Sequence, residues 1–219
     1  MPPLDSSTTY DAKLSSILRS AADVFARKGY HDATIRDVSA AAGVSLSGLY
    51  YYVESKEHLL FLIQDERLGC LLRAQHQGIM DADGPEERVR SLVRTHLRAF
   101  AENAEEMKVL SRESDALTGR YWDVIDARRR EYVDLARSVL SEVRPTPSPV
   151  DLRSATFFLF GMMNWLHNWY DAEQDGNVDH LADQMAHVVL RGLSDPNGWE
   201  PGPGVMGPEL SETPGTVAG

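Results

Sequence analysis

Residues 33–60 read ATIRDVSAAAGVSLSGLYYYVESKEHLL, and this stretch decides the fold. Its helical spacing predicts two short helices separated by a turn at Gly43. Glycine can adopt the positive φ that a sharp turn between two helices requires. Val38 and Leu49 can meet across the pair, and small residues around them allow close approach. Two short helices around such a turn form the pattern of a helix-turn-helix.

Polar residues predict where the helices of this stretch begin. Thr34 is placed to cap the first helix, and Asp37 at its third position resembles a capping box. Ser45 can cap the second helix, and Ser55 opens a long helix that follows. These local signals agree with the apolar spacing, so three successive helix starts are predicted.

The second short helix would expose a polar and aromatic surface that fits the major groove of DNA. The tyrosines Tyr50 to Tyr52 are consecutive, so at least one must be exposed. Arg36 carries the fork that reads guanine, and hydroxyl groups and Lys56 suit phosphate contacts. The candidate DNA-binding residues are Thr34, Arg36, Ser45, Leu46, Ser47, Gly48, Tyr50, Tyr51, Tyr52 and Lys56.

Not every residue on this surface can read bases. Leu46 and Gly48 offer no hydrogen bonds to base edges. Base readout would therefore depend on Arg36, Ser47 and Tyr51. The N-terminal arm is poor in basic residues, so it is not expected to contact DNA.

Charge is distributed unevenly along the 219 residues. The net charge is −11, which by itself argues against nonspecific binding to nucleic acid. Residues 1–60 carry six Lys and Arg against seven Asp and Glu, a net charge of −1. The remainder carries 16 against 26, a net charge of −10. DNA binding therefore belongs to the first 60 residues.

Composition excludes several other classes of protein. Hydrophobic residues are 42% and charged residues 25%, as in an ordinary soluble protein. No apolar run is long enough for a membrane span, and the N-terminus does not resemble a secretory signal. The single cysteine, Cys70, excludes an internal disulfide. We expect a cytoplasmic protein without a membrane partner.

Catalytic and metal sites are not expected. No glycine-rich phosphate loop is present, and no nucleophile stands beside a base, so the chain is not predicted to be an enzyme. His180, Asp183 and His187 could share one helix face, as a metal site or as surface polar contacts. We predict no metal and no cofactor.

The whole chain reads as helical, and nothing reads as a strand. The predicted helices cover about 11–28, 35–42, 46–52, 55–77, 86–102, 105–116, 119–143, 150–171 and 178–193. The fold class is all-α, with an N-terminal three-helix helix-turn-helix domain followed by a larger helical domain for ligand binding and dimerisation. The expected boundaries are 1–56 for the DNA-binding domain, 57–195 for the effector domain, and 196–219 for a flexible Pro/Gly-rich tail.

The predicted helix 150–171 is apolar nearly all round, so it should be buried on several sides. A dimer interface on one side and a pocket on the other would satisfy this. Asn164, His167 and Asn168 are polar groups in this helix. They could anchor a polar group of a ligand or hydrogen-bond across the dimer.

Residues 14–60 resemble the TetR family of bacterial transcriptional regulators. The matches are Phe25, Gly29, Tyr30, Thr34, Val38, Ala42, Gly43, Val44, Ser45, Leu49, Tyr50, Ser55, Lys56, Glu57 and Leu59. Ser39 and Val53 depart mildly from the family pattern. The resemblance implies a homodimer joined through the last two helices, a roughly palindromic operator of double-stranded DNA, and a ligand that releases a repressor from it.

A finer resemblance points to the acyl-CoA-responsive, FadR-related branch of that family. It rests on residues 109–113, 128–132, 161–165 and 168–170. Met-, Phe- and Trp-rich helices suit an acyl chain, and the run Arg128–Arg130 could bind CoA phosphates or form a solvated face. The best effector is a long-chain or ring-bearing acyl-CoA of fatty-acid or sterol catabolism; the alternative is a free hydrophobic drug or antibiotic. The candidate ligand-binding residues are Phe100, Met107, Leu110, Trp122, Arg129, Phe158, Met162, Trp165 and Trp169.

Overall fold

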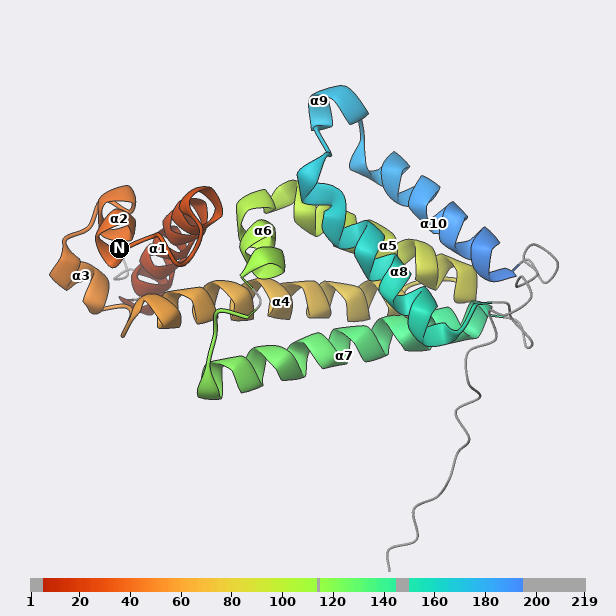
Figure 1. Cartoon of the computed structure of the whole chain (residues 1–219), viewed down its shortest axis with the longest axis horizontal. Coiled ribbons are helices and arrows are strands. Elements are labelled where there is room, and N and C mark those ends of the chain that lie inside the picture. The colour runs from red at the N-terminus through yellow and green to blue at the C-terminus, as the bar shows by residue number, and fades with distance from the viewer. Residues whose placement is uncertain (1–5, 114, 145–149, 195–219) are drawn as a thin grey trace, which may run out of the picture.

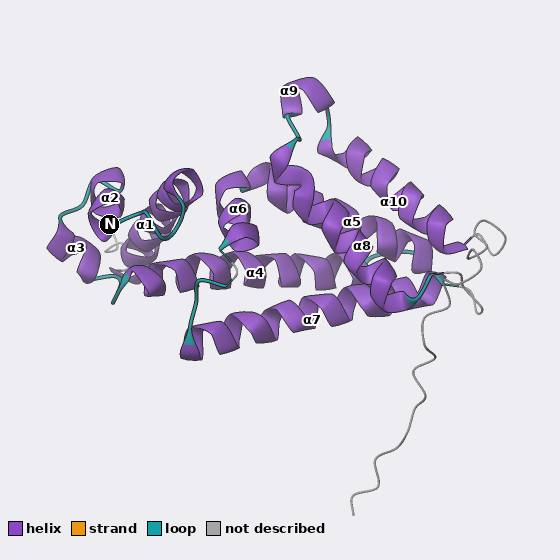
Figure 2. Cartoon of the chain, viewed as in Figure 1, coloured by secondary structure: helices purple, strands orange, loops and turns teal. Residues whose placement is uncertain are grey.

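The structure is a computed structural model that describes residues 6–113, 115–144 and 150–194. Its helices are α1 (Ser6–Lys28), α2 (Ile35–Ala41), α3 (Leu46–Tyr50), α4 (Lys56–Met80), α5 (Pro85–Glu102), α6 (Ala104–Arg112), α7 (Gly119–Val143), α8 (Leu152–Asn164), the 3-10 helix η1 (Trp165–Asn168), α9 (Ala172–Asp175) and α10 (Val178–Ser194). The described residues contain no strand (Figure 2), and the predicted all-α class is confirmed.

The helices form a small head and a larger body (Figure 1). Helices α1 to α3 make the head at one end, and α4 runs out of the head into the body beside α7. Helix α5 packs against α4 and α10, while α6 packs against α1. The body therefore contacts the head through both α4 and α6. Within the described residues, no helix is long and apolar enough to cross a membrane.

The predicted helix caps are present in the head. The Thr34 side chain accepts a hydrogen bond from the backbone N–H of Asp37, whose carboxylate accepts one from the Thr34 N–H at 2.8 Å. Lys28 donates to that carboxylate at 2.6 Å, and this bond, followed by those from Thr34, lowers the pKa of Asp37 to about 2. Ser45 and Ser55 likewise cap α3 and α4. The capping box predicted for α2 is confirmed.

The turn between α2 and α3 is built as its sequence requires. Gly43 has a φ of +62°, a conformation that side chains disfavour. Val38 and Leu49 are fully buried in the core of the head. The Ser39 hydroxyl donates to the Val44 carbonyl at 2.6 Å, which ties the end of α2 to the turn. Ser39 thereby gains a bond that an alanine could not make.

The predicted single helix over 150–171 is wrong. Helix α8 ends at Asn164, and the chain continues through η1 and the short α9. Side chains here compete for backbone carbonyls: His167 Nδ1 donates to the Asn164 carbonyl at 2.7 Å, and Asn168 donates to that of Trp165 at 3.3 Å. Such local bonds take carbonyls away from the α-helical ladder. Helix α6 also ends earlier than predicted, and residues 196–219 lie outside the described residues.

Candidate functional site

The outer end of the head carries exposed side chains on α2 and α3. Arg36, Ser47 and Tyr50 are exposed, and Tyr51 is 73% exposed. Tyr52 is half-buried, because its ring packs on Tyr10 of α1 with ring centroids 4.8 Å apart. Helix α3 lies at the tip of the molecule, away from the body (Figure 1). The structure therefore leaves four of the candidate DNA-binding side chains exposed on or beside α2 and α3.

Other candidate DNA-binding residues serve mainly to build that surface. The hydroxyls of Thr34 and Ser45 are engaged in helix caps. Leu46 and Gly48 are partly buried. A Cβ at Gly48 would lie 3.1 Å from Ser45 Oγ, so a larger residue there would crowd the cap.

The structure gives Lys56 a different role from the predicted phosphate contact. Its ammonium donates to the backbone carbonyls of Tyr30, His31 and Ala33 at 2.8, 3.2 and 2.9 Å. It also lies 4.4 Å from the centroid of the Tyr30 ring. An ammonium has three N–H donors, and all three are engaged here. Lys56 thus holds the loop between α1 and α2 instead of facing DNA.

We expect Lys56→Met to destabilise the protein while leaving the salt dependence of DNA binding unchanged. Losing a charged donor from three loop carbonyls should lower the free energy of unfolding by about 1.5–3 kcal/mol. Urea unfolding measures this, with the exposed Lys28→Met as a control that should change little. An unchanged stability together with a shallower salt slope would restore the phosphate role.

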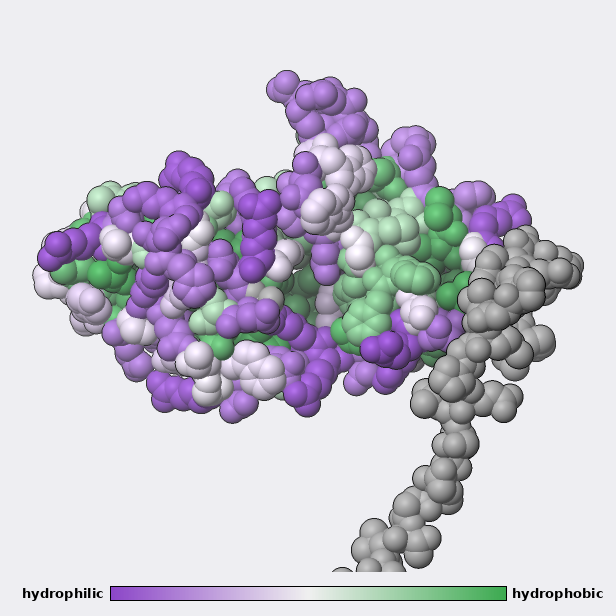
Figure 3. All heavy atoms as spheres, viewed as in Figure 1, coloured by the Kyte–Doolittle hydropathy of each residue, from purple (hydrophilic) through white to green (hydrophobic). Residues whose placement is uncertain are grey.

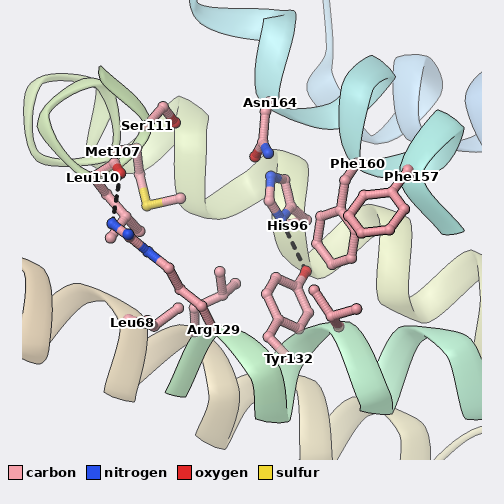
Figure 4. Close-up of a pocket in the computed structure, with 12 residues that line it drawn as sticks. Leu68, His96, Met107, Leu110, Ser111, Arg129, Tyr132, Phe157, Phe160 and Asn164 are labelled. Atoms are coloured by element: carbon pink, nitrogen blue, oxygen red, sulfur yellow. Dashed lines mark hydrogen bonds between the residues drawn. The ribbon is translucent and has the colours of Figure 1, made fainter. Parts of the chain in front are cut away.

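The body contains a pocket of about 290 Å³ that five helices enclose. Its surface opening lies between α6 and α8 (Figure 3). The wall is mostly apolar, with a few polar groups that converge on the cavity (Figure 4). The lining residues are Leu68, Leu71, His96, Met107, Leu110, Ser111, Arg129, Tyr132, Val133, Phe157, Phe160 and Asn164. A concave apolar site with few polar groups is typical of small-molecule binding.

The predicted ligand-binding residues divide between this pocket and other surfaces. Met107, Leu110 and Arg129 line it. Phe100 lies behind it, with its ring 5.1 Å from that of His96. Trp122 is exposed on α7 and lies outside the pocket lining. Besides Phe100, five of the predicted ligand-binding residues do not line this pocket: Trp122, Phe158, Met162, Trp165 and Trp169.

A buried polar chain reaches the pocket from α4 and α7. The Gln75 amide donates to the Tyr132 hydroxyl at 2.8 Å, and that hydroxyl lies 2.8 Å from His96 Nδ1. His96 is almost fully buried. Desolvation lowers the pKa of His96 to about 3, although nearby Asn164 opposes this shift. His96 is therefore neutral at physiological pH.

The buried His96 should make folding stability depend on pH. In the unfolded chain the pKa of His96 returns to about 6.5. Below that pH the unfolded state therefore binds a proton at His96, whereas His96 in the folded state stays neutral. Stability should fall by about 1.4 kcal/mol per pH unit from pH 6.5 towards pH 3. Urea unfolding at several pH values measures the slope. His96→Phe should flatten it and the exposed His31→Phe should not; equal slopes in all three proteins would refute this assignment.

The run Arg128–Arg130 divides between the two predicted roles. Arg128 pairs with Asp65 at 2.9 Å in half-buried surroundings, whereas Arg130 is exposed and pairs with Asp126. Arg129 instead turns into the pocket (Figure 4), where desolvation lowers its pKa. A charge with restricted access to water on a pocket wall is a candidate for contact with a polar ligand.

A chain of hydrogen bonds connects Arg129 to the head. Arg129 donates to Gln64 Oε1 at 3.0 Å, and Gln64 Nε2 donates to the Glu113 carbonyl at 3.0 Å. The Glu113 carboxylate in turn accepts from the backbone N–H of Tyr30 at 3.1 Å. Lys56 donates a hydrogen bond to the backbone carbonyl of Tyr30. We call Arg129, Gln64, Glu113 and Tyr30 the pocket-to-head chain.

A second apolar surface lies over α8, η1 and α10. Phe158 and Trp165 are each 64% exposed, and Val188 is 59% exposed. An open groove on this surface, of about 530 Å³, is lined by Gly161, Met162, Trp165, Trp169, Leu181, Gln184, Met185 and Val188. Hydrophobic residues gather over this region (Figure 3). We call it the α8–α10 face; apolar patches exposed in this way mark contact surfaces.

Other residues singled out from the sequence have ordinary partners or surroundings. Asp183 pairs with Arg94 at 2.9 Å, and His180 lies 2.8 Å from the Gln184 amide. Within the described ranges, no group of three potential metal ligands comes together. Cys70 is exposed on α4 and not packed in a core.

Sequence reasoning missed the polar pocket residues His96 and Tyr132, and Gln75, which bonds Tyr132 from behind the lining. His96 stands among the buried positions of α5, with Leu92 and Phe100 one turn away on either side. A histidine on the apolar face of an amphipathic helix was the available signal. Nothing in the local sequence indicated that Tyr132 would contact His96, or that Gln75 would contact Tyr132.

Two family models match the chain. The model for bacterial regulatory proteins of the tetR family matches residues 17–63. A model described as the tetracyclin repressor-like C-terminal domain matches residues 82–193. Together they span the head and most of the body.

Similar curated proteins are transcriptional regulators. The HTH-type transcriptional repressor KstR2 of Rhodococcus jostii (strain RHA1) is 24% identical over 200 residues, 90% of this chain and 98% of that protein. The fatty acid metabolism regulator protein of Bacillus subtilis (strain 168) is 20% identical over 185 residues, 83% of this chain and 95% of that one.

Solved structures share the fold over most of the chain. A TetR-family transcriptional regulator from Bordetella parapertussis 12822 has a TM-score of 0.77 and 29% identity, covering 82% of this chain and 94% of that one. AibR, solved in complex with isovaleryl coenzyme A and operator DNA, has a TM-score of 0.73 and 26% identity, covering 81% and 98%.

Proposed function

The chain belongs to the TetR family of bacterial transcriptional regulators, and from this premise we propose that it is a homodimeric repressor released from its operator by a short acyl-CoA. The observation that carries the proposal is the pocket-to-head chain, which joins a ligand-sized cavity to the loop at the base of the DNA-binding helices. In this proposal, the DNA-binding head ends at about residue 56. The effector-binding body follows it and ends at about residue 195.

DNA recognition is assigned to the open surface of α2 and α3. Arg36 carries a guanidinium that can read guanine, and Ser47, Tyr50 and Tyr51 present hydroxyls to bases or phosphates. Thr34, Ser45, Leu46 and Gly48 shape the helix that enters the major groove. Two heads related by a two-fold axis would read a roughly palindromic operator.

Dimerisation is assigned to the α8–α10 face. Its large apolar side chains are exposed in the single chain, and burying them against a second copy would remove them from water. Met162, Trp165 and Trp169 then have a role in the dimer interface instead of the pocket. A face shared by two copies is self-complementary, as a two-fold dimer requires.

The ligand is proposed to be an acyl-CoA with a short, branched acyl group. The wall of the pocket is mostly apolar, which suits an acyl chain. The choice of a short, branched acyl group is supported by AibR, which was solved with isovaleryl coenzyme A. Arg129 lies within reach of a polar part of such a ligand.

Release would follow from competition for Arg129. A ligand that takes hydrogen bonds from Arg129 weakens its bond to Gln64, and through Glu113 this shifts the loop that carries Tyr30. Helix α4 would transmit the same shift, because it contributes both Gln64 and Lys56. The ligand and the operator then bind most tightly to different arrangements of the head. Each of them therefore lowers the affinity of the protein for the other by the same factor.

Native mass spectrometry tests the proposal directly. We expect a dimer that takes up one or two molecules of isovaleryl-CoA, and no uptake of coenzyme A without its acyl group at the same concentration. A dimer that takes up neither compound would remove the acyl-CoA assignment while leaving the DNA-binding assignment intact. A monomer at micromolar concentration would remove the assignment of the α8–α10 face.

A further inference from the structure

Gln75, Tyr132 and His96 form a series of hydrogen bonds at one end of the pocket. In each bond of this series, the structure determines which atom donates and which accepts. The Leu92 backbone carbonyl accepts from Gln75 Nε2 at 2.9 Å. A carbonyl can only accept, so this contact decides which way the Gln75 amide faces. The flipped amide would put two oxygens together, even though the present orientation leaves Gln75 Oε1 without a partner among the described residues. The second N–H of this amide donates to the Tyr132 hydroxyl at 2.8 Å.

This direction decides where the proton of His96 lies. The Tyr132 oxygen accepts from Gln75, so its own hydrogen is available to His96 Nδ1 at 2.8 Å. A neutral imidazole whose Nδ1 accepts a hydrogen bond carries its proton on Nε2. Tyr132 is itself buried and keeps its proton, because burial raises its pKa. The hydrogen bonds from Gln75 to Tyr132 and from Tyr132 to His96 therefore leave His96 Nε2–H as a donor.

The Nε2–H points towards Asn164 on the pocket wall (Figure 4) and has no hydrogen-bond partner in the described structure. The Nε2 atom is itself buried. The Asn164 amide lies beside Nε2 (Figure 4) and raises the pKa of His96 as a hydrogen-bond partner would, but the two side chains do not reach hydrogen-bond geometry. Arg129 lies on the far side of the cavity (Figure 4). A buried donor on a pocket wall without a hydrogen bond is stabilised by an acceptor on the occupant of the pocket.

We infer that His96 is a specificity-determining residue whose Nε2–H binds the thioester carbonyl oxygen of the acyl-CoA. This inference rests on the proposed function and deepens it. The donor is uncharged, so it suits a neutral carbonyl, whereas a free carboxylate placed there would be buried beside a ring that supplies no charge. Gln75 and Tyr132 act as positioning residues, because they hold the ring in the tautomer that donates.

The test compares two ligands that differ only at that carbonyl. Isothermal titration calorimetry of the full chain is run with isovaleryl-CoA and with its thioether analogue 3-methylbutyl-CoA, in which a methylene replaces the carbonyl. We expect the wild type to bind the thioester about 10-fold more tightly. His96→Phe should bind the two compounds equally. Tyr132→Phe, which keeps the histidine but frees its tautomer, should narrow the preference to about 2- to 3-fold.

The matched control is Tyr121→Phe, which removes an exposed hydroxyl from the same helix and should keep the full preference. If the wild type binds both compounds equally, the acyl-CoA proposal stands and the role of His96 is overturned. If His96→Phe retains the preference, another group reads the carbonyl and the role is likewise overturned. If the wild type binds neither compound, the proposed effector class and this inference are overturned together.

Discussion

Val188→Asp is expected to convert the dimer into a monomer and to weaken operator binding by 100-fold or more. Val188 lies in the groove of the α8–α10 face and is 59% exposed in the single chain. In a two-fold dimer the substitution places two carboxylates in one apolar interface, where burying a charge without a partner is costly. The single chain keeps the side chain in water, so folding should be little affected.

The loss of DNA affinity follows from the loss of a second half-site. Two linked heads bind with an effective concentration that can multiply the affinity of one head by about 10²–10⁴. Analytical ultracentrifugation and operator titration measure the two effects. The control is Val124→Asp, which introduces the same charge at a 41% exposed position on α7. A dimer that persists in Val188→Asp would contradict the assignment of this face.

Gln64→Met is expected to separate ligand binding from DNA release. Gln64 is fully buried and joins Arg129 to the Glu113 carbonyl. Methionine has a similar length but cannot make either bond. Coupling between ligand and DNA, about 5- to 150-fold in allosteric proteins generally, should fall to about 1- to 3-fold, while each partner still binds alone.

The coupling is obtained from the operator affinity measured with and without isovaleryl-CoA. Gln77→Met serves as the control, because Gln77 is an exposed residue of the same helix that bonds only Asp81 in the described structure. Its coupling should equal that of the wild type. Coupling that survives intact in Gln64→Met would show that another route, such as the packing of α6 on α1, carries the signal.

The head could be predicted from the sequence because its signals are local. Thr34, Asp37 and Ser45 act within four residues of the positions they cap, and Gly43 acts on its own φ. Lys56 was the exception. A basic side chain at a helix start suits a phosphate, but the loop carbonyls that it binds lie 23 to 26 residues earlier in the chain.

The pocket could be predicted only in part, because it depends on how five helices meet. Trp122 and Arg129 stand on the same helix, yet only Arg129 turns into the cavity. The aromatic residues after Phe157 indicated burial, but a single chain does not bury Phe158 or Trp165. Apolar side chains are found both in the hydrophobic core of one chain and in the interface between two copies of it. Composition alone does not distinguish a core residue from an interface residue.

Operator affinity with and without the ligand tests most directly whether the pocket controls the head. Binding sites are first selected from a random double-stranded DNA library, and affinity for the enriched site is then measured by fluorescence anisotropy at fixed salt concentration. We predict enrichment of a two-fold symmetric site and at least 10-fold weaker binding with excess isovaleryl-CoA. An enriched site whose affinity is the same with and without the bound ligand would contradict the central claim that the pocket controls the head.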